Sequence, residues 1–490
     1  MKNEAIYRLF FAILITTIVA SSCKKAMINP LKKDGSVVAP TVNADLALTT
    51  QTNLRVVGYL YQYDVNKWNQ YTDSVDLDQL SHIIYSFVNP YTNHTLNLSG
   101  DVINAGVVNA VTKCHNKSIE TFYAIGGGGA TAYWDTLINP ANRAQTITQL
   151  RKIATAYNFD GIDIDLEGSR ITVNYNDFLI QLSDTLVQYS KKLSIALGKW
   201  QGNQVSAQAY SRLNYLNAMI YDFQYSTAQS ASSFSDFQNH ITFFKTKLAA
   251  SKINAGVPFY ASKYEGNTWL GQTIAYNKML EVNAKAYDLN YSYSTPTQSW
   301  WFDGHPVIRQ KVAHCLQQSV GGMMVWQALF DTKDDKSSLF KLINYCAANP
   351  SGFNPADAYV LSNWGNGKAM VVDGSTDGAA VVQRTVSTAA TQWKIGAPGG
   401  NSYVFTNAGN NMVLQVTAAS LSDGAGISQG IYSGANHQQF KLVSDMKGYY
   451  TLTNVNSNKP AQTNGTADNT PLTQNAASGG NNQKWRLSRQ

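Results

Sequence analysis

The sequence predicts a multidomain protein, a (β/α)8 barrel (TIM barrel) followed by an all-β domain. Between residues 54 and 350, short apolar runs alternate with amphipathic stretches. Strands that alternate with helices form a parallel sheet, and eight such units predict a closed barrel. From residue 356 the chain is rich in Asn, Gly, Ser, Thr and Gln, and one motif recurs three times. An open, doubly wound sheet is the structural alternative for the first domain.

The strands of the barrel are predicted from runs rich in β-branched and aromatic residues. These runs are RVVGYLY (55–61), SHIIYSFVNP (81–90), ETFYAIGGGG (120–129), FDGIDIDLEG (159–168), KLSIALGKW (192–200), NAMIYDFQY (217–225), INAGVPFY (253–260) and GGMMVWQ (321–327). Helical candidates lie between them, among them NRAQTITQLRKIATAYN (142–158) and NDFLIQLSDTLVQYSKK (176–192).

The N-terminus has the features of an export signal. Lys2 and Arg8 precede the apolar run LFFAILITTIVA (9–20), and SSC ends at Cys23. A basic start, a short apolar segment and small residues are typical of a secretory signal over residues 1–22. The ending resembles a bacterial lipobox, which predicts a lipid on Cys23 and a lipoprotein anchored to the cell envelope, at the outer membrane or cell surface. Plain cleavage and secretion is the alternative. Residues 23–53 are polar and predict a linker.

The composition of the chain limits the classes of partner and cofactor that we expect the protein to bind. The net charge of +7 is scattered, without a Lys/Arg cluster for phosphates, so we expect no nucleic acid. The seven histidines and the widely spaced Cys114, Cys315 and Cys346 show no metal-ligand spacing, so we expect no metal, no cofactor and buried free thiols. We expect contact with a membrane only through the lipid anchor, and a monomer.

The all-β segment contains an internal repeat. DGAAVVQ (377–383), DGAGISQ (423–429) and DNTPLTQ (468–474) are each followed by an aromatic residue, Trp393, Phe440 or Trp485. Three copies of one unit predict three-fold pseudosymmetry, since no single unit could bury its own apolar face. The Gln-x-aromatic endings resemble the ricin-type β-trefoil lectins, although Thr391 replaces Gln in the first repeat.

Whether the trefoil-like domain binds sugar is left open by its sequence. Sugar-binding repeats of ricin-type lectins usually pair an early Asp with a late Asn-Gln. The first repeat has Asp373 without the Asn, and the third has Asn482 without the Asp. A glycan-binding domain over residues 356–490 and a purely structural module therefore both fit.

The run FDGIDIDLEG places three acids on one face of a strand. Because side chains alternate along a strand, Asp163, Asp165 and Glu167 share a face, and the intervening apolar residues share the other. Three carboxyls in a barrel interior cannot all ionise cheaply, so at least one must hold a proton. Glu167 comes last, at the end of the strand where barrel enzymes place their chemistry, and is the candidate general acid. A structural or metal-binding acid cluster is the alternative. Asp160 has the opposite parity and is expected to be scaffold.

The segment DGIDIDLE (160–167) resembles the Asp-Gly-x-Asp-x-Asp-x-Glu signature of glycoside hydrolase family 18, the chitinases and endo-β-N-acetylglucosaminidases. Further segments resemble other strands of that family: YAIGGGG (123–129), MIYD (219–222), GVPFY (256–260) and GGMMVW (321–326). The resemblance covers nearly all of residues 54–350. Leu166 and Gly168 stand where the family commonly has aromatic residues.

The resemblance implies roles for individual residues. Glu167 would protonate the glycosidic oxygen while the 2-acetamido group of the substrate attacks the anomeric carbon. Asp165 would orient that group and Asp163 would share a proton with Asp165. Tyr221 would donate to the acetamido oxygen. The expected substrate-binding residues are Asp222, Trp326 as a floor under the sugar, and Tyr59 and Phe87 as walls, for which core packing is an equal alternative.

The expected partner is a carbohydrate polymer that contains N-acetylglucosamine. The forms of MIYD and GVPFY favour an endo-acting chitinase, and release of N-glycans from glycoproteins is the alternative. Residues 261–320 are predicted to be too short for the α+β insertion of some chitinases, which predicts an open groove. Tyr264, Trp269, Trp300 and Trp301 could line that groove, and surface or core packing is an equal alternative for each. A non-catalytic chitin-binding lectin is a further alternative, which the presence of Glu167 disfavours.

Overall fold

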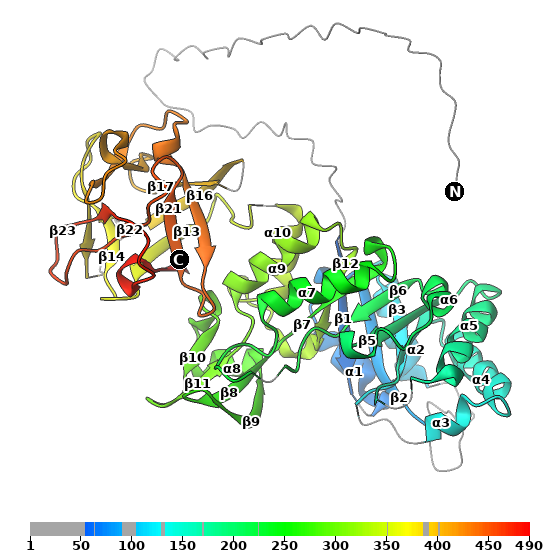
Figure 1. Cartoon of the computed structure of the whole chain (residues 1–490). Helices are drawn as coiled ribbons and strands as arrows, with labels where there is room; N and C mark the ends of the chain where they lie inside the picture. Colours follow the sequence, from blue (N-terminus) through cyan, green and yellow to red (C-terminus); the bar gives the residue numbers. More distant parts are fainter. Residues whose placement is uncertain are drawn as a thin grey trace, which may run out of the picture. The chain divides into compact units, whose positions relative to one another are not determined.

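The computed structural model describes most of the chain after the predicted linker (Figure 1). The described residues are 54–62, 64–90, 104–128, 133–168, 171–223, 225–349, 351–385, 392–399 and 402–490. The predicted signal segment, Cys23, the linker and Thr391 lie outside them. Among the described residues, no helix is both long and apolar enough to cross a membrane.

Eight parallel strands close the predicted barrel, in the order β1-β12-β7-β6-β5-β4-β3-β2. They are β1 (Arg55–Tyr61), β2 (His82–Val88), β3 (Glu120–Gly126), β4 (Gly161–Asp165), β5 (Lys192–Leu197), β6 (Tyr215–Ala218), β7 (Ile253–Pro258) and β12 (Gly322–Trp326). The barrel is thereby confirmed, and the open-sheet alternative is wrong. The sixth strand ends earlier than its apolar run, so Tyr221 and Asp222 lie in the loop beyond it.

Helices cover the outside of the barrel (Figure 1). They are α1 (Trp68–Ser74), α2 (Ala105–His115), α3 (Tyr133–Leu137), α4 (Arg143–Ala156), α5 (Val173–Val187), α6 (Ala207–Arg212), α7 (Phe234–Lys245), α9 (His305–Gln317) and α10 (Leu339–Ala348). Ile162, Ile164 and Leu166 belong to the large core between strands and helices. The interior contains a second, smaller cluster with Val57, Phe122 and Met324. The alternation in β4 therefore separates its apolar face from its acidic face as predicted.

The segment between β7 and β12 contains a small α+β insertion, so the prediction that it is too short for one is wrong. Its elements are β8 (Tyr260–Glu265), β9 (Thr268–Ala275), α8 (Tyr276–Val282), β10 (Tyr291–Tyr293) and β11 (Gln298–Trp301). The strands form an antiparallel sheet in the order β10-β11-β8-β9. Antiparallel strands need only short turns, such as that around Gly266 between β8 and β9, so few residues suffice. The predicted open groove loses its basis, and Tyr264, Trp300 and Trp301 are buried in the insertion while Trp269 is exposed.

The C-terminal domain is the predicted β-trefoil. Its strands are β13 (Ala358–Asn363), β14 (Ala369–Val372), β15 (Val381–Arg384), β16 (Gln392–Gly399), β17 (Ser402–Asn407), β18 (Val413–Val416), β19 (Ile427–Gly430), β20 (Phe440–Ser444), β21 (Tyr450–Asn454), β22 (Ala461–Gln462), β23 (Thr470–Pro471), β24 (Thr473–Gln474) and β25 (Trp485–Arg489). Trp393, Phe440 and Trp485 are fully buried in one core, as the repeat predicts.

Glutamines at the ends of the three repeated motifs link the repeats to one another. Gln383, Gln429 and Gln474 are fully buried. Each side-chain amide donates to two backbone carbonyls of another repeat: Gln383 to Gly465 and Ala467, Gln429 to Gly374 and Thr376, and Gln474 to Ser420 and Ser422. A buried amide with its hydrogen bonds satisfied stabilises the loop that it binds. The recurrence of this Gln therefore has a structural cause.

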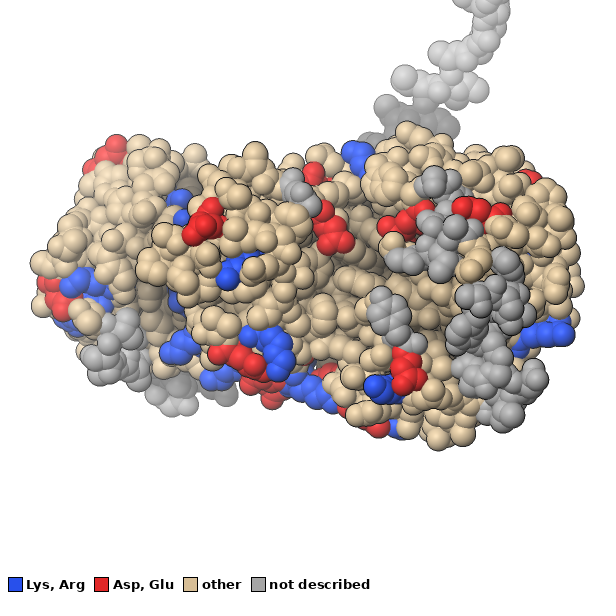
Figure 2. Space-filling view, turned by 90° about the horizontal axis from the view of Figure 1, so that it is seen from below, with Lys and Arg blue, Asp and Glu red and all other residues tan. Residues whose placement is uncertain are grey.

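The trefoil packs directly against the insertion within one compact unit, Thr49–Gln490. Tyr291 on β10 and Tyr449 share a hydrogen bond between hydroxyls of 3.3 Å. The amide of Asn290 donates to the carbonyl of Lys447 at 2.9 Å, and the Arg486 Nε donates to Asp288 at 2.6 Å. Figure 2 shows acidic and basic side chains interspersed over the face that it draws.

Candidate active site

Asp163 lies in the barrel interior and is the best-bonded acid of β4. It is fully buried and accepts hydrogen bonds from the Tyr59 hydroxyl (2.6 Å), the Ser194 hydroxyl (2.6 Å) and the Asn217 amide (3.0 Å). The side chain of Asn217 is oriented in turn, because its Oδ1 accepts a hydrogen bond from the side-chain amide of Asn254 at 2.9 Å. Burial raises the pKa of Asp163, and the bonds from Ser194, Tyr59 and Asn217 oppose that rise. Asp163 is thus an anchored carboxyl under the site.

Asp165 ends β4 two residues after Asp163 and is also buried, with 4% of its surface exposed. Its Oδ1 has no hydrogen-bond partner among the described residues. Burial raises the pKa of Asp165 well above its ordinary value, and the charges of Glu167 and Asp163 raise it further. Burial beside two other acids therefore favours the protonated form of Asp165.

Glu167 follows the strand end and is half-buried. A glycine-rich segment at the end of β3 approaches it: a Cβ on Gly128 would lie 3.6 Å from the Glu167 Oε1. A Cβ on Gly126, whose φ is +101°, would lie 2.2 Å from the Asp165 carbonyl oxygen. Only glycine permits this approach and conformation together. Gly126 and Gly128 of this run therefore shape the backbone beside the acid.

Tyr221 and Asp222 flank the acids from the loop after β6. Tyr221 is 9% exposed, and its hydroxyl lies 3.7 Å from the Met324 sulfur. Burial raises the pKa of Tyr221 well above its ordinary value, with contributions from the charges of Asp165, Asp222 and Glu167. Its hydroxyl therefore remains a donor. Asp222 is exposed and accepts a hydrogen bond from the Tyr260 hydroxyl.

Aromatic rings gather at the ends of β1, β2 and β12. Trp326 and Phe87 stack with ring centroids 6.0 Å apart, and Tyr59 and Tyr61 lie 5.7 and 5.4 Å from Trp326. Trp326 and Phe87 are half-buried, so both keep surface for a ligand. Tyr59 is 1% exposed and its hydroxyl is bound to Asp163. Its position favours a supporting role, and its contact with substrate stays a prediction.

The structure brings the predicted residues of four strands to one end of the barrel, and it adds three that sequence reasoning missed. Ser194 pairs directly with Asp163 across β5 and β4, Asn217 lies on β6, and Tyr260 begins β8. For Ser194 and Asn217, the available signal was a polar residue between apolar neighbours of a barrel strand. Asp160 lies apart from the site and binds His115 and Thr121. Within the described part of the chain, no group of three or more His, Cys, Asp or Glu side chains could hold a metal ion.

Two family models match the chain. Glycosyl hydrolases family 18 matches residues 55–331, more than half of the chain, and the ricin-type beta-trefoil lectin domain-like family matches residues 351–430 and 431–490. The sequence resemblance to both families is thereby confirmed.

Individual proteins are similar over the barrel. Endochitinase 1 of Metarhizium robertsii is 24% identical over 387 residues, which cover 61% of this chain and 90% of that protein. Nod factor hydrolase protein 1 of Medicago truncatula is 24% identical over 333 residues, 54% of this chain and 84% of that protein. The crystal structure of the chitinase ChiB from Flavobacterium johnsoniae aligns with a TM-score of 0.53 at 24% identity, covering 61% of this chain and 95% of that chain, and shows a shared fold.

Proposed function

Because the chain belongs to glycosyl hydrolases family 18, we propose that it is a retaining glycosidase that cleaves β-1,4-linked N-acetylglucosamine polymers, chitin or chito-oligosaccharides. The observation that carries the proposal is that three acids, two on β4 and one just after it, differ in their burial and in their hydrogen bonds. Asp163 is anchored by three donors, Asp165 is buried with an unpartnered oxygen among the described residues, and Glu167 is half-buried beyond the strand end. Glu167 is thus the partly exposed acid of the three, with Asp165, whose pKa is raised, behind it.

In the proposed reaction, Glu167 gives its proton to the glycosidic oxygen as the bond to the anomeric carbon breaks. The carbonyl oxygen of the substrate's own 2-acetamido group forms the new bond to that carbon, which yields an oxazolinium ion. Asp165 gives the proton that it shares to Asp163, and its carboxylate then accepts a hydrogen bond from the acetamido N–H and stabilises the positive charge of that group. Tyr221 donates its hydroxyl to the acetamido oxygen. Glu167 then takes a proton from the water that opens the ring, with retention of configuration.

The positions of the aromatic residues support a sugar site above the acids. Trp326 ends β12 and presents a half-buried ring beside Phe87. Flat apolar faces of this kind pack against the C–H faces of a pyranose ring. The ring of Trp326 would pack against the reacting sugar. Asp222, whose carboxylate accepts a hydrogen bond from the Tyr260 hydroxyl, would bind the hydroxyl groups of that sugar.

The Glu167→Gln variant tests the proposed general acid. Glutamine keeps the shape of the side chain but has no proton to give, so kcat on a chito-oligosaccharide should fall by about 10²–10⁴-fold. Glu281→Gln, which changes an exposed glutamate of α8, should leave kcat unchanged. Parent-like hydrolysis by Glu167→Gln would refute the assignment. Absence of hydrolysis in the parent, with chitin binding retained, would favour the non-catalytic lectin.

Analysis of the reaction products distinguishes between the two candidate substrates, chitin and N-glycosylated protein. Mass analysis of digests of chitin oligomers and of a high-mannose glycoprotein should show cut oligomers and an unmodified glycoprotein. Internal cleavage of long oligomers, rather than stepwise loss of dimers, would support the endo-acting mode. Intact N-glycans released without any cut chitin would overturn the proposal in favour of an endo-β-N-acetylglucosaminidase.

We further propose that the protein is an exported lipoprotein anchored through Cys23, on the basis of the sequence that precedes this residue. In bacteria fed labelled palmitate, the parent should carry the label and fractionate with the envelope. The Cys23→Ala variant should lose both properties. An unlabelled parent in the medium would support plain secretion instead.

A further inference from the structure

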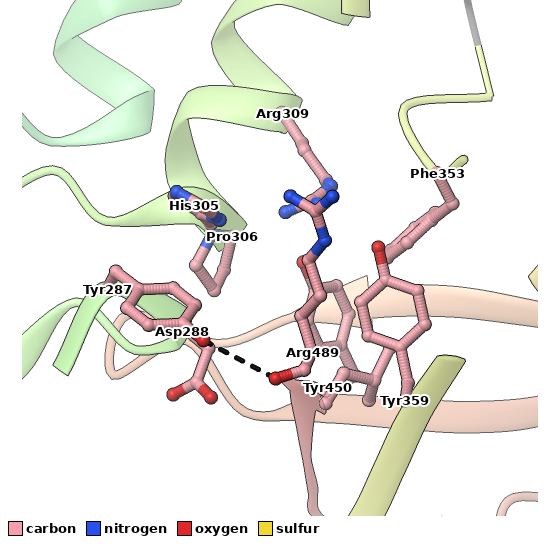
Figure 3. A pocket seen from close by; sticks show the side chains of 10 residues that line it. Tyr287, Asp288, His305, Pro306, Arg309, Phe353, Tyr359, Tyr450 and Arg489 are labelled. Atoms are coloured by element: carbon pink, nitrogen blue, oxygen red, sulfur yellow. Dashed lines mark hydrogen bonds between the residues drawn. The ribbon is translucent and has the colours of Figure 1, made fainter. Parts of the chain in front are cut away.

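Two adjoining hollows lie between helix α9 and the trefoil, away from the acidic strand. They share Pro306, Arg309, Phe353 and Tyr450. The first, shown in Figure 3, holds about 10 Å³, the space of one water at most. The second holds about 100 Å³ and is also lined by Tyr403 and Leu442 from the trefoil and Cys346 from α10. The second is therefore large enough for a small ligand.

Among the described residues that line the larger cavity, Arg309 alone is charged. The Nε of Arg309 donates to the Gly352 carbonyl at 2.7 Å, and its guanidinium carbon lies 4.6 Å from the centre of the Phe353 ring. None of these lining residues carries a carboxylate. Asp357, at the trefoil side, is held by Arg489 at 2.9 Å. The guanidinium of Arg309 also hydrogen-bonds the Tyr359 side chain. A partly buried guanidinium without an acid still leaves further donors that favour an anion.

Tyr450 adds a second donor to the same cavity. Its side chain is 5% exposed, and its hydroxyl has no hydrogen-bond partner among the described residues. Burial raises the pKa of Tyr450, so the hydroxyl keeps its proton. By contrast, the Tyr403 hydroxyl donates to the Ser351 carbonyl at 3.3 Å. A buried donor left without an acceptor is uncommon and points to a ligand that supplies one.

We propose that this cavity is a binding site for a small organic carboxylate. The guanidinium of Arg309 and the hydroxyl of Tyr450 bind the carboxylate oxygens, and the rings of Phe353 and Tyr403 enclose the apolar body. The barrel supplies Arg309 and the trefoil supplies Tyr450. A bound carboxylate therefore stabilises the contact between the two domains without touching the acids of β4.

Binding is tested by calorimetric titration of the full chain with sodium benzoate and sodium acetate, and with phosphate and chloride at matched ionic strength. The proposal expects saturable binding of a carboxylate at one site and a matching rise in the melting temperature. Tighter binding of benzoate than of acetate would support the enclosure of the ligand's apolar body by aromatic rings. Phosphate binding alone, equal effects of chloride, or no saturable binding would overturn it.

Variants separate a ligand site from a structural one. Tyr450→Phe removes a hydroxyl without a partner among the described residues, so the free protein should be at least as stable, while carboxylate affinity falls about 10-fold. Arg309→Gln should weaken binding by at least about 100-fold. Tyr432→Phe and Arg212→Gln, which lie outside the cavity, should bind as the parent does. Unchanged affinity in folded Tyr450→Phe would contradict the proposal even where Arg309→Gln fails to fold.

Discussion

At the scale of single residues, the acids of β4 show what alternation can predict. The parity of Asp163, Asp165 and Glu167 placed all three on the inner face, and Asp163 and Asp165 are buried there. Their different environments could not be predicted in the same way. Tyr59, Ser194 and Asn217 bind Asp163 from three other strands, and the register between strands is set by the closed barrel rather than by any local pattern.

The raised pKa of Asp165 has a measurable consequence for stability. Its folded-state pKa is raised by burial and by Glu167 and Asp163. The folded state is therefore penalised once the pH passes the unfolded pKa of about 3.9, and the penalty grows until the folded pKa is reached. Asp165→Asn removes this penalty, so the variant should be more stable than the parent at neutral pH and lose the advantage toward pH 4. Urea unfolding over this range measures the difference.

The same Asp165→Asn variant should be less active, because an amide cannot pass a proton to Asp163 and become the carboxylate that stabilises the developing positive charge of the acetamido group. Asp184→Asn changes an exposed acid on α5 and should alter neither stability nor activity. A variant that is less stable than the parent at neutral pH would show that Asp165 is ionised in the folded protein.

At the scale of elements, the apolar runs predicted the barrel strands well because buried parallel strands are almost continuously apolar. The prediction was poorer where a run continues past a strand end. The sixth run continues to Tyr225, but β6 ends at Ala218. Asp222 has a φ of +64°, a left-handed conformation that lies outside the extended region of a regular strand. The insertion was missed because its short strands carry mixed polar residues, with no apolar run to reveal them.

The glutamines that link the trefoil repeats are expected to be essential for its stability. Gln474→Leu removes the buried amide that donates to the carbonyls of Ser420 and Ser422, which should cost about 2–4 kcal/mol of unfolding free energy. Thermal or denaturant unfolding of the full chain measures this loss.

Gln490→Leu, at the exposed C-terminus, is the matched control and should unfold as the parent does. A Gln474→Leu variant of parental stability would mean that water reaches the two carbonyls. The recurrence of this Gln would then have another cause.

At the scale of the whole molecule, the change of composition near residue 350 predicted two domains but could not predict that they pack together. The contact depends on scattered residues, among them Asp288, Asn290 and Tyr291 on one side and Tyr449 and Arg486 on the other. Such positions share no motif or periodicity. Contacts of this kind join residues that are far apart in the sequence and form only once both domains are folded. No local sequence pattern therefore predicts them.

Gly448 tests how far the two domains unfold together. It has a φ of +91°, and a Cβ there would lie 3.0 Å from Asn290 N, Leu289 Cα and Pro306 Cγ. Gly448→Val should therefore disturb the contact, lower the melting temperature and separate the calorimetric transitions of the domains.

Gly465 provides the matched control, because its φ is +79° and no described atom lies within 4 Å of the place that a Cβ would take. Gly465→Val carries similar backbone strain without a clash against the insertion. Equal losses of melting temperature in both variants would show that the contact contributes nothing.

The first and last strands of the trefoil lie side by side, since β13 pairs with β25 and the amide of Gln490 donates to the Ala358 carbonyl at 3.0 Å. The three repeats therefore form a closed ring of strands. The pairing that closes this ring does not depend on which repeat the chain enters first. A gene rearranged to start at the second repeat would encode the same ring.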